Sequence, residues 1–370
     1  MNKSNLKEIA GLFLKLGITG FGGPAAHIAM MRSEVVVKRQ WISDEHFLDL
    51  VGATNLIPGP NSTELAIHIG NERGGWKGLF VAGLCFILPA VIITGFFAWL
   101  YSRYGQLPEV QPYIYGIKPA IIAIILGAVS PLAKKSMKTI QLALVAGLVF
   151  VLSLLGINEI VLLFGAGLLA LMLTSVRNKI PSVFPWPFLQ ITGALATPSG
   201  VGLFLTFLKI GAILYGSGYV LFAFLDTELV STGLLSRQQL IDAIAVGQFT
   251  PGPVFSAVIF VGYQISGWQG ATVATIGIFL PSFAFVAMLN PLVKKMRNSV
   301  SFSAFLDAVN VASVAIIAAI CVELGRATIN DWRTVLIALT GAIFTFGFRQ
   351  INSAFIVLGG SLLGYLLTFV

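Results

Sequence analysis

Two Pro-Gly-Pro triplets, Pro58-Gly59-Pro60 and Pro251-Gly252-Pro253, occupy the positions best suited to chemistry in this sequence. Proline lacks an N–H and clashes with the preceding turn, so neither triplet fits inside a regular helix. Both lie between apolar segments, and non-helical backbone at membrane depth must be buried in protein or line a water-filled cavity. The N–H groups at the start of the helix after such a break attract anions. The alternative interpretation is a kink that serves only packing.

The first triplet leads into polar residues that the second triplet lacks. Asn61 and Ser62 are predicted to cap the half-helix after the break. Glu64 and His68 are four residues apart and share one helix face, which suits proton coupling or gating. A hydrogen bond between them that fixes the hairpin is the alternative, and a metal pair is disfavoured because no third ligand is evident. We therefore expect the first hairpin to carry the polar chemistry and the second mostly backbone and shape.

Two glycine-rich breaks of the same kind add candidate substrate-binding residues. They are Gly22-Gly23-Pro24 and Gly216-Ser217-Gly218. Together with the triplets they make four breaks, which would form an anion-coordinating centre, although packing kinks again remain the alternative. His27, just after the first glycine break, is either part of that site or a packing or capping group.

Three lysines lie inside apolar segments, where ionisable residues are functional candidates. Lys15 and Lys209 occupy equivalent places and are predicted to attract substrate, unless they extend to the membrane interface. Lys118 is a third candidate, for coupling or gating. Four acidic residues are instead interpreted as solvated or capping carboxylates at the membrane edges: Glu34, Glu228, Asp49 and Asp242.

The elements that must position these residues are membrane helices. The chain of 370 residues is 56% hydrophobic and 10% charged, whereas soluble domains carry about 25% charged residues. The net charge of +8 is not interpreted as nucleic-acid binding, because Lys and Arg gather in the cytoplasmic loops of membrane proteins. A basic pore for anions is the alternative source of this charge. Cys85 and Cys321 are interpreted as packing residues. No enzymatic or nucleotide-binding motif is present, so no cofactor is predicted. If such a chain transports a solute, the lack of a nucleotide motif predicts that transport is passive or driven by an ion gradient.

One unit of about 185 residues occurs twice in the sequence. Phe13-Leu14-Lys15-Leu16-Gly17 matches Phe207-Leu208-Lys209-Ile210-Gly211, and Gly75-Trp76-Lys77-Gly78 matches Gly267-Trp268-Gln269-Gly270. The predicted domains are therefore a first repeat at 1–176, a Pro-rich linker at 177–200 and a second repeat at 201–370.

The predicted fold is an all-α polytopic membrane protein with about five spans and one re-entrant helical hairpin in each repeat. Segments 45–57 and 61–70 are each shorter than the roughly 20 residues that cross a membrane, so they are predicted to form the first hairpin. A polar loop is expected at 32–46. Lys134, Lys135 and Lys138 follow the span at 113–133, whereas Lys294, Lys295 and Arg297 follow the span at 270–293. Because these loops do not correspond between the repeats, the positive-inside rule predicts inverted topologies.

These residues resemble the chromate transporter (CHR) family in its long-chain form with two homologous halves. Three segments carry the resemblance: Phe21-Gly22-Gly23-Pro24 with Ala26-His27, the stretch from Asn55 to Gly70, and Gly247-Gln248-Phe249-Thr250-Pro251-Gly252-Pro253. The resemblance implies a bacterial or archaeal inner-membrane protein that exports chromate and confers chromate resistance, with sulfate as a competing dianion. It also implies substrate-linked roles for both triplets, for Gly22, Gly23 and Pro24, and for His27.

The sequence as a whole predicts a secondary transporter that binds a tetrahedral oxyanion between the four breaks while the two halves rock around it. The lipid bilayer is the other expected partner, nucleic acid is not, and a homodimer is left open. Transport of sulfate or another oxyanion, or a channel, is the alternative within transport. A membrane enzyme or lipid-handling protein that uses Glu64 and His68 is the alternative outside it.

Overall fold

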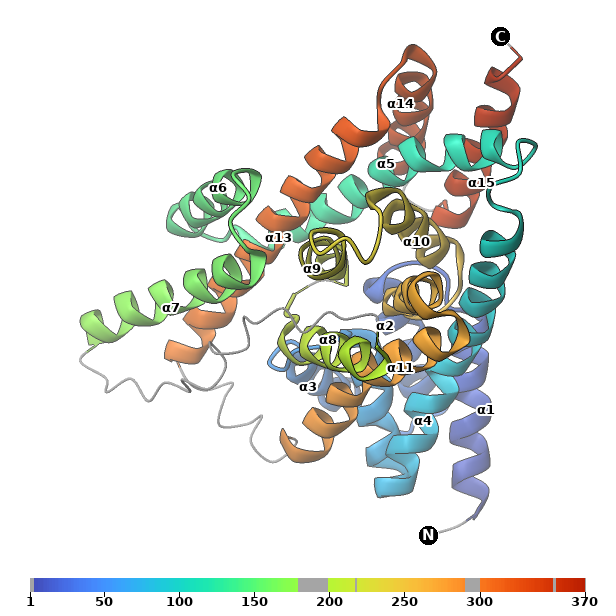
Figure 1. Cartoon of the computed structure of the whole chain (residues 1–370). Coiled ribbons are helices and arrows are strands. Elements are labelled where there is room, and N and C mark those ends of the chain that lie inside the picture. Colours follow the sequence, from blue (N-terminus) through green and yellow to red (C-terminus); the bar gives the residue numbers. More distant parts are fainter. Residues whose placement is uncertain (1–2, 179–198, 217, 290–299, 349–350, 370) are drawn as a thin grey trace.

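A computed structural model describes residues 3–178, 199–216, 218–289, 300–348 and 351–369. Within these ranges the chain is helical and contains no β-strand, as the predicted fold class requires (Figure 1). Among the described residues, four helices are long and apolar enough to cross a membrane, at 61–104, 111–136, 254–288 and 301–328. Most of the predicted linker, Ser217, Lys294, Lys295 and Arg297 lie outside the described residues.

The elements of the first half (3–178) follow the predicted segments closely. In chain order they are α1 (Lys3–Thr19), α2 (Pro24–Arg32), a π-helical turn (Ser33–Lys38), α3 (Asp44–Thr54), α4 (Asn61–Tyr104), α5 (Gln111–Ser136), α6 (Ile140–Leu154) and α7 (Glu159–Asn178). The prediction of a polar loop from residue 32 is wrong at its start, because the π-helical turn continues α2 to Lys38.

The second half (199–369) repeats this order. Its elements are α8 (Gly200–Ile213), α9 (Val220–Leu225), a π-helical turn (Asp226–Val230), α10 (Arg237–Phe249), a 3-10 turn (Val254–Ser256), α11 (Ala257–Leu289), α13 (Val300–Thr328), α14 (Trp332–Gly347) and α15 (Ser353–Leu367). The helices stop at all four predicted breaks, so the local effect of proline and glycine decides where the elements end.

The long helices α4 and α11 each contain a tight reversal. The backbone leaves helical geometry at Gly75, where φ is 56°, and at Gly267, where φ is also 56°. The two arms of α4 pack so closely that a Cβ on Gly70 would lie 2.4 Å from the carbonyl oxygen of Gly78. Each element is therefore a half-helix that follows a Pro-Gly-Pro triplet and then folds back into a longer helix.

The two halves exchange helices with each other. In the first half α5 packs against α14 and α15 of the second half, and in the second half α13 packs against α6 and α7 of the first half. Figure 1 shows α13 running past α7 and α5. Helices α4 and α11 pack together, with α1 against α4 and α8 against α11. This packing brings both Pro-Gly-Pro triplets into the protein, where residues 56–60 and 250–256 are all buried.

Candidate substrate site

Each Pro-Gly-Pro triplet is hydrogen-bonded to the glycine break of the opposite half. The N–H of Gly59 donates to the carbonyl of Leu214 over 2.8 Å, and the N–H of Gly252 donates to the carbonyl of Gly20 over 2.7 Å. We call residues 58–60 with 214–216 the first junction, and residues 251–253 with 20–23 the second junction. The structure thus pairs the four predicted breaks across the two halves.

The central glycine of each triplet is required by both conformation and space. The φ angle is 133° at Gly59 and 96° at Gly252, values that L side chains rarely adopt. A Cβ on Gly59 would lie 2.2 Å from Oε1 of Glu64, and one on Gly252 would lie 2.8 Å from Cβ of Ala90. The triplets therefore contribute backbone geometry to the site and leave the side-chain chemistry to their neighbours.

The helices that begin at the junctions have no side-chain cap. This holds for α2, α4 and the turn that leads into α11. Six helices that begin elsewhere are capped, by the side chains of Ser43, Thr139, Ser199, Ser236, Asp331 and Asn352, whereas α5 begins without a side-chain cap at Val110. The predicted capping by Asn61 and Ser62 is wrong, because the amide of Asn61 donates to Oδ1 of Asn55 instead, over 2.8 Å. Uncapped helix starts keep the partial positive charge that attracts anions.

The first junction contains a buried acid and a buried imidazole. Glu64 is fully buried, and its Oε1 lies 3.4 Å from the hydroxyl of Ser282 on α11. Its Oε2 and both ring nitrogens of His68 have no hydrogen-bond partner among the described residues. The alternative of a Glu64–His68 hydrogen bond is therefore wrong. Buried polar atoms are rarely left unpaired, so these atoms mark a place where a proton or water is expected.

The second junction is stabilised by His27. Its Nε2 lies 2.9 Å from the Gly20 carbonyl, which also accepts the N–H of Gly252. Because a carbonyl can only accept, Nε2 carries a hydrogen, and Nδ1 is buried with no hydrogen-bond partner among the described residues. The bond from Nε2 holds the break in place, and a substrate-binding role of His27 stays a prediction.

The second junction is also lined by polar side chains, some of them from the second hairpin, and which hairpin carries the polar chemistry stays a prediction. The hydroxyl of Thr94 on α4 lies 3.4 Å from the hydroxyls of both Thr250 and Ser256. The hydroxyl of Tyr219 donates to Oε1 of Gln248 over 3.4 Å, and Nε2 of Gln248 is buried with no partner. All five of these residues are uncharged.

The two lysines at equivalent positions of the repeats are paired with acids of their own half. Lys15 lies 3.1 Å from Glu34, and Lys209 lies 2.7 Å from Glu228. The interpretation of Glu34 and Glu228 as solvated or capping carboxylates is wrong, since both are buried ion-pair partners. Hydrogen bonds from Lys38 first, and then Lys15, lower the pKa of Glu34 to about 2. These pairs tie α1 and α8 to the π-helical turns.

Lys118 lies away from both junctions, in a polar cavity of about 280 Å³. Seven residues line this cavity: Tyr101, Gln106, Gln111, Ile114, Lys118, Gln238 and Asp242. Asp242 is buried and accepts from the Tyr101 hydroxyl over 2.6 Å, so the prediction of a solvated carboxylate is wrong there, whereas Asp49 is exposed. Lys118 and Asp242 thus share one cavity between α5 and α10.

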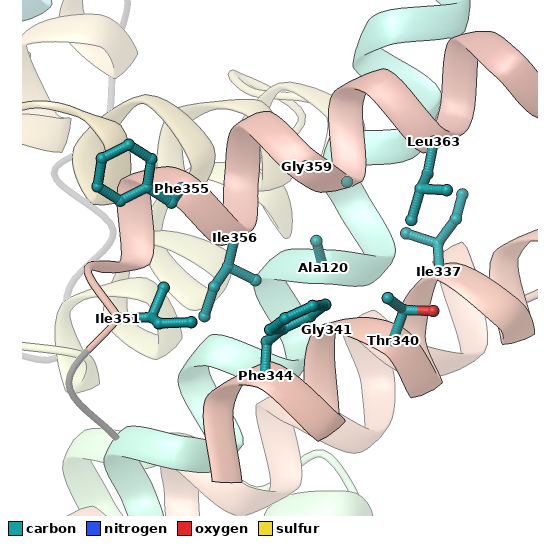
Figure 2. A pocket seen from close by; sticks show the side chains of 11 residues that line it. Ala120, Ile337, Thr340, Gly341, Phe344, Ile351, Phe355, Ile356, Gly359 and Leu363 are labelled. Atoms are coloured by element: carbon teal, nitrogen blue, oxygen red, sulfur yellow. The ribbon is translucent and has the colours of Figure 1, made fainter. Parts of the chain in front are cut away.

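A second cavity, of about 190 Å³, is almost entirely apolar (Figure 2). It lies between α5, α14 and α15, where Ala120 faces Gly341, Phe344 and Ile356. Thr340 is the single polar side chain among its lining residues. An anion would find no donor set there, so this cavity is not a candidate for the substrate site.

Four residues at the junctions were missed in the sequence: Thr94, Tyr219, Gln248 and Ser282. The repeat contained a signal for two of them. Gln248 stands three residues before Pro251, as Asn55 stands before Pro58, and Ser282 follows Pro281 where Ala90 follows Pro89. Nothing in the local sequence distinguishes Thr94 or Tyr219 from other hydroxyl residues of apolar helices.

These features define the class of the protein as a multi-pass helical membrane protein whose broken helices meet in its interior. A model of the family described as chromate transporter matches residues 7–171 and again residues 201–365, which shows two homologous halves. The chain belongs to the chromate transporter family.

Curated relatives extend over most of the chain. A probable chromate transport protein of Synechococcus elongatus is 33% identical over 92% of this chain and 89% of its own length. A chromate transport protein of Cupriavidus metallidurans is 32% identical over 97% of this chain and 92% of its own length. An uncharacterized transporter of Methanocaldococcus jannaschii is 27% identical over 99% of this chain and 95% of its own length. No solved structure matches this chain.

Proposed function

We propose that this protein is a secondary transporter that exports chromate across the inner membrane and thereby confers chromate resistance. The observation that carries the proposal is the reciprocal pair of hydrogen bonds, from Gly59 to Leu214 and from Gly252 to Gly20, which joins uncapped helix starts from both halves. Family membership and the names of the relatives supply chromate as the substrate. Sulfate, another tetrahedral dianion, is proposed to compete.

Electrical driving force favours export of a dianion. A membrane potential of about 100 mV, negative inside, lowers the free energy of two outgoing negative charges by about 4.6 kcal/mol. Entry of a proton in exchange would add to this force. We assign coupling to Glu64 and His68, because both are buried and both carry polar atoms without a partner among the described residues.

Inverted repeats and re-entrant hairpins are part of the proposal. Two units related by a pseudo-two-fold axis are expected to make each contact twice, once from each half. The packing of α5 on α14 and α15 matches that of α13 on α6 and α7, and the junction bonds are likewise reciprocal. The half-helices that flank each triplet have the lengths expected of a hairpin that enters and leaves by one face. The two halves would then rock around substrate held between them, with Lys118 acting as a gate beside Asp242.

The proposal is tested with purified protein in sealed liposomes. Chromate loaded inside should leave at a rate that increases with an outside-positive potential, and external sulfate should lower that rate. Liposomes without protein are the control for leakage. If protein-containing and empty liposomes lose chromate at the same rate while another oxyanion crosses, the substrate assignment is wrong. If no oxyanion crosses, the transport function itself is wrong.

A further inference from the structure

We propose that Gln248 and Tyr219, together with the backbone N–H groups of Gly22 and Gly23, form the oxyanion-binding site, and that the first junction does not bind the anion. This inference deepens the proposed function and rests on it. It divides two roles between the junctions: the second binds the anion through neutral donors, and the first handles the coupled proton.

Gln248 provides the first observation. Its side chain is 5% exposed, and Nε2 has no hydrogen-bond partner within the described part of the chain. Oε1 accepts from the hydroxyl of Tyr219 over 3.4 Å, so the amide group is oriented with its two N–H bonds unused. A buried amide donor without a partner is costly, and a bound anion would satisfy it.

The position of Tyr219 links this amide to the start of α2. A Cβ built on Gly23 would lie 4.0 Å from the hydroxyl of Tyr219, so this hydroxyl borders the space in front of Gly23. Gly22 and Gly23 are half-buried, whereas Gln248 is buried. Among the described residues, no backbone carbonyl accepts a hydrogen bond from the N–H of Gly22 or Gly23. The Tyr219 hydroxyl thus lies between the backbone donors at the start of α2 and the buried amide of Gln248, which is the side-chain donor of the proposed site.

Charge separates the two junctions. The carboxyl of Glu64 occupies the first junction, where Gly59 and Ser282 surround it, and a carboxylate there would repel a dianion. The residues identified at the second junction carry no carboxylate. Lys15 and Lys209 are each engaged by a glutamate of their own half, so neither neutralises the anion. A site made of neutral donors and a helix start would bind a dianion loosely enough to release it.

The first half does not offer the same donors. Asn55 stands where Gln248 stands in the repeat, but it is exposed, and both ends of its amide are engaged by Val51 and Asn61. Ala25 stands where Tyr219 stands. The anion site is therefore a property of one junction, although the backbone of the two junctions is equivalent.

The test measures how oxyanions protect the purified protein against thermal unfolding. Chromate, sulfate, molybdate and phosphate are titrated against the wild type and against Gln248→Glu, which keeps the shape and the bond from Tyr219 but replaces the amide donor by a negative charge. The matched control is Gln269→Glu, the same change on the exposed turn after Gly267. Losing a hydrogen bond to a charged group corresponds to about tenfold or more in affinity. We expect the oxyanion affinity of Gln248→Glu to fall at least about tenfold. Gln269→Glu should bind oxyanions like the wild type.

Equal protection of Gln248→Glu and the wild type would overturn the inference. If Gln248→Glu does not fold, the test uses Tyr219→Phe instead. This change removes the hydroxyl that donates to Gln248 and keeps the ring packed against Phe222. It should weaken oxyanion binding several-fold, and unchanged binding would again overturn the inference. A wild type that binds none of the four oxyanions overturns it as well. Because binding of several oxyanions is measured, failure of chromate to cross liposomes counts against the proposed function alone.

Discussion

Replacing Glu64 by glutamine should uncouple transport from the pH gradient while leaving oxyanion binding intact. The side chain is fully buried, and its one contact within hydrogen-bond distance in the described part of the chain is the Ser282 hydroxyl at 3.4 Å. Glutamine has the same shape and can keep that contact, but it cannot take up or release a proton. A single carboxyl group binds and releases one proton in each transport cycle.

The magnitude follows from that stoichiometry. A pH difference of about one unit is worth about 1.4 kcal/mol for each proton, which is about a tenfold ratio of chromate across the membrane at steady state. The ratio should approach one in Glu64→Gln. Both sides are kept above neutral pH so that chromate stays a dianion, and the membrane potential is set to zero with potassium and valinomycin.

Chromate inside and outside the liposomes is measured after the ratio becomes constant. The matched control is Glu45→Gln, the same change on the exposed face of α3. It should keep the wild-type ratio. A Glu64→Gln protein that still builds up the tenfold ratio would refute the assignment of proton coupling to this carboxyl. Loss of oxyanion binding in the same variant would instead place the anion at the first junction.

Two further predictions concern stability, measured as thermal unfolding in detergent. Lys209→Met should destabilise the protein by about 3–5 kcal/mol, since it leaves Glu228 buried without its partner, whereas Lys15→Met, at a lysine whose side chain is 58% exposed, should cost about 1 kcal/mol or less. Equal effects would contradict the difference in burial between the two ion pairs. Gly59→Ala should cost about 1–3 kcal/mol more than Gly233→Ala, because both glycines have positive φ but only Gly59 would place a methyl against Glu64. A smaller cost at Gly59 than at Gly233 would mean that Glu64 moves away freely.

Most of the secondary structure followed from local chemistry. Proline and glycine end helices wherever they occur in such clusters, so the breaks before Pro24 and between α3 and α4 could be placed from the sequence. The repeat could also be recognised, because it lies in the order of residues and needs no fold. The π-helical turn after α2 could not, since polar residues such as Glu34 and Lys38 are typical of loops as well.

The roles of the charged residues were harder to predict from the sequence than the secondary structure. Lys209 and Glu228 each satisfied a sequence rule separately, one as an intramembrane lysine and the other as an edge carboxylate. Only the packing of α8 against the turn after α9 shows that they neutralise each other. Asp242 is a similar case, because its partner Tyr101 belongs to the other half.

The sequence alone therefore determined that the chain crosses a membrane, that it consists of one unit repeated, and that four helix breaks lie at matching positions. These properties depend on composition, residue order and steric effects within a few residues. Only the tertiary structure decided that each triplet meets the break of the opposite half, and that Gln248 and Tyr219 border one junction while Glu64 and Ser282 border the other. Contacts such as Glu64–Ser282 join residues 218 positions apart, and they depend on how all the intervening helices pack.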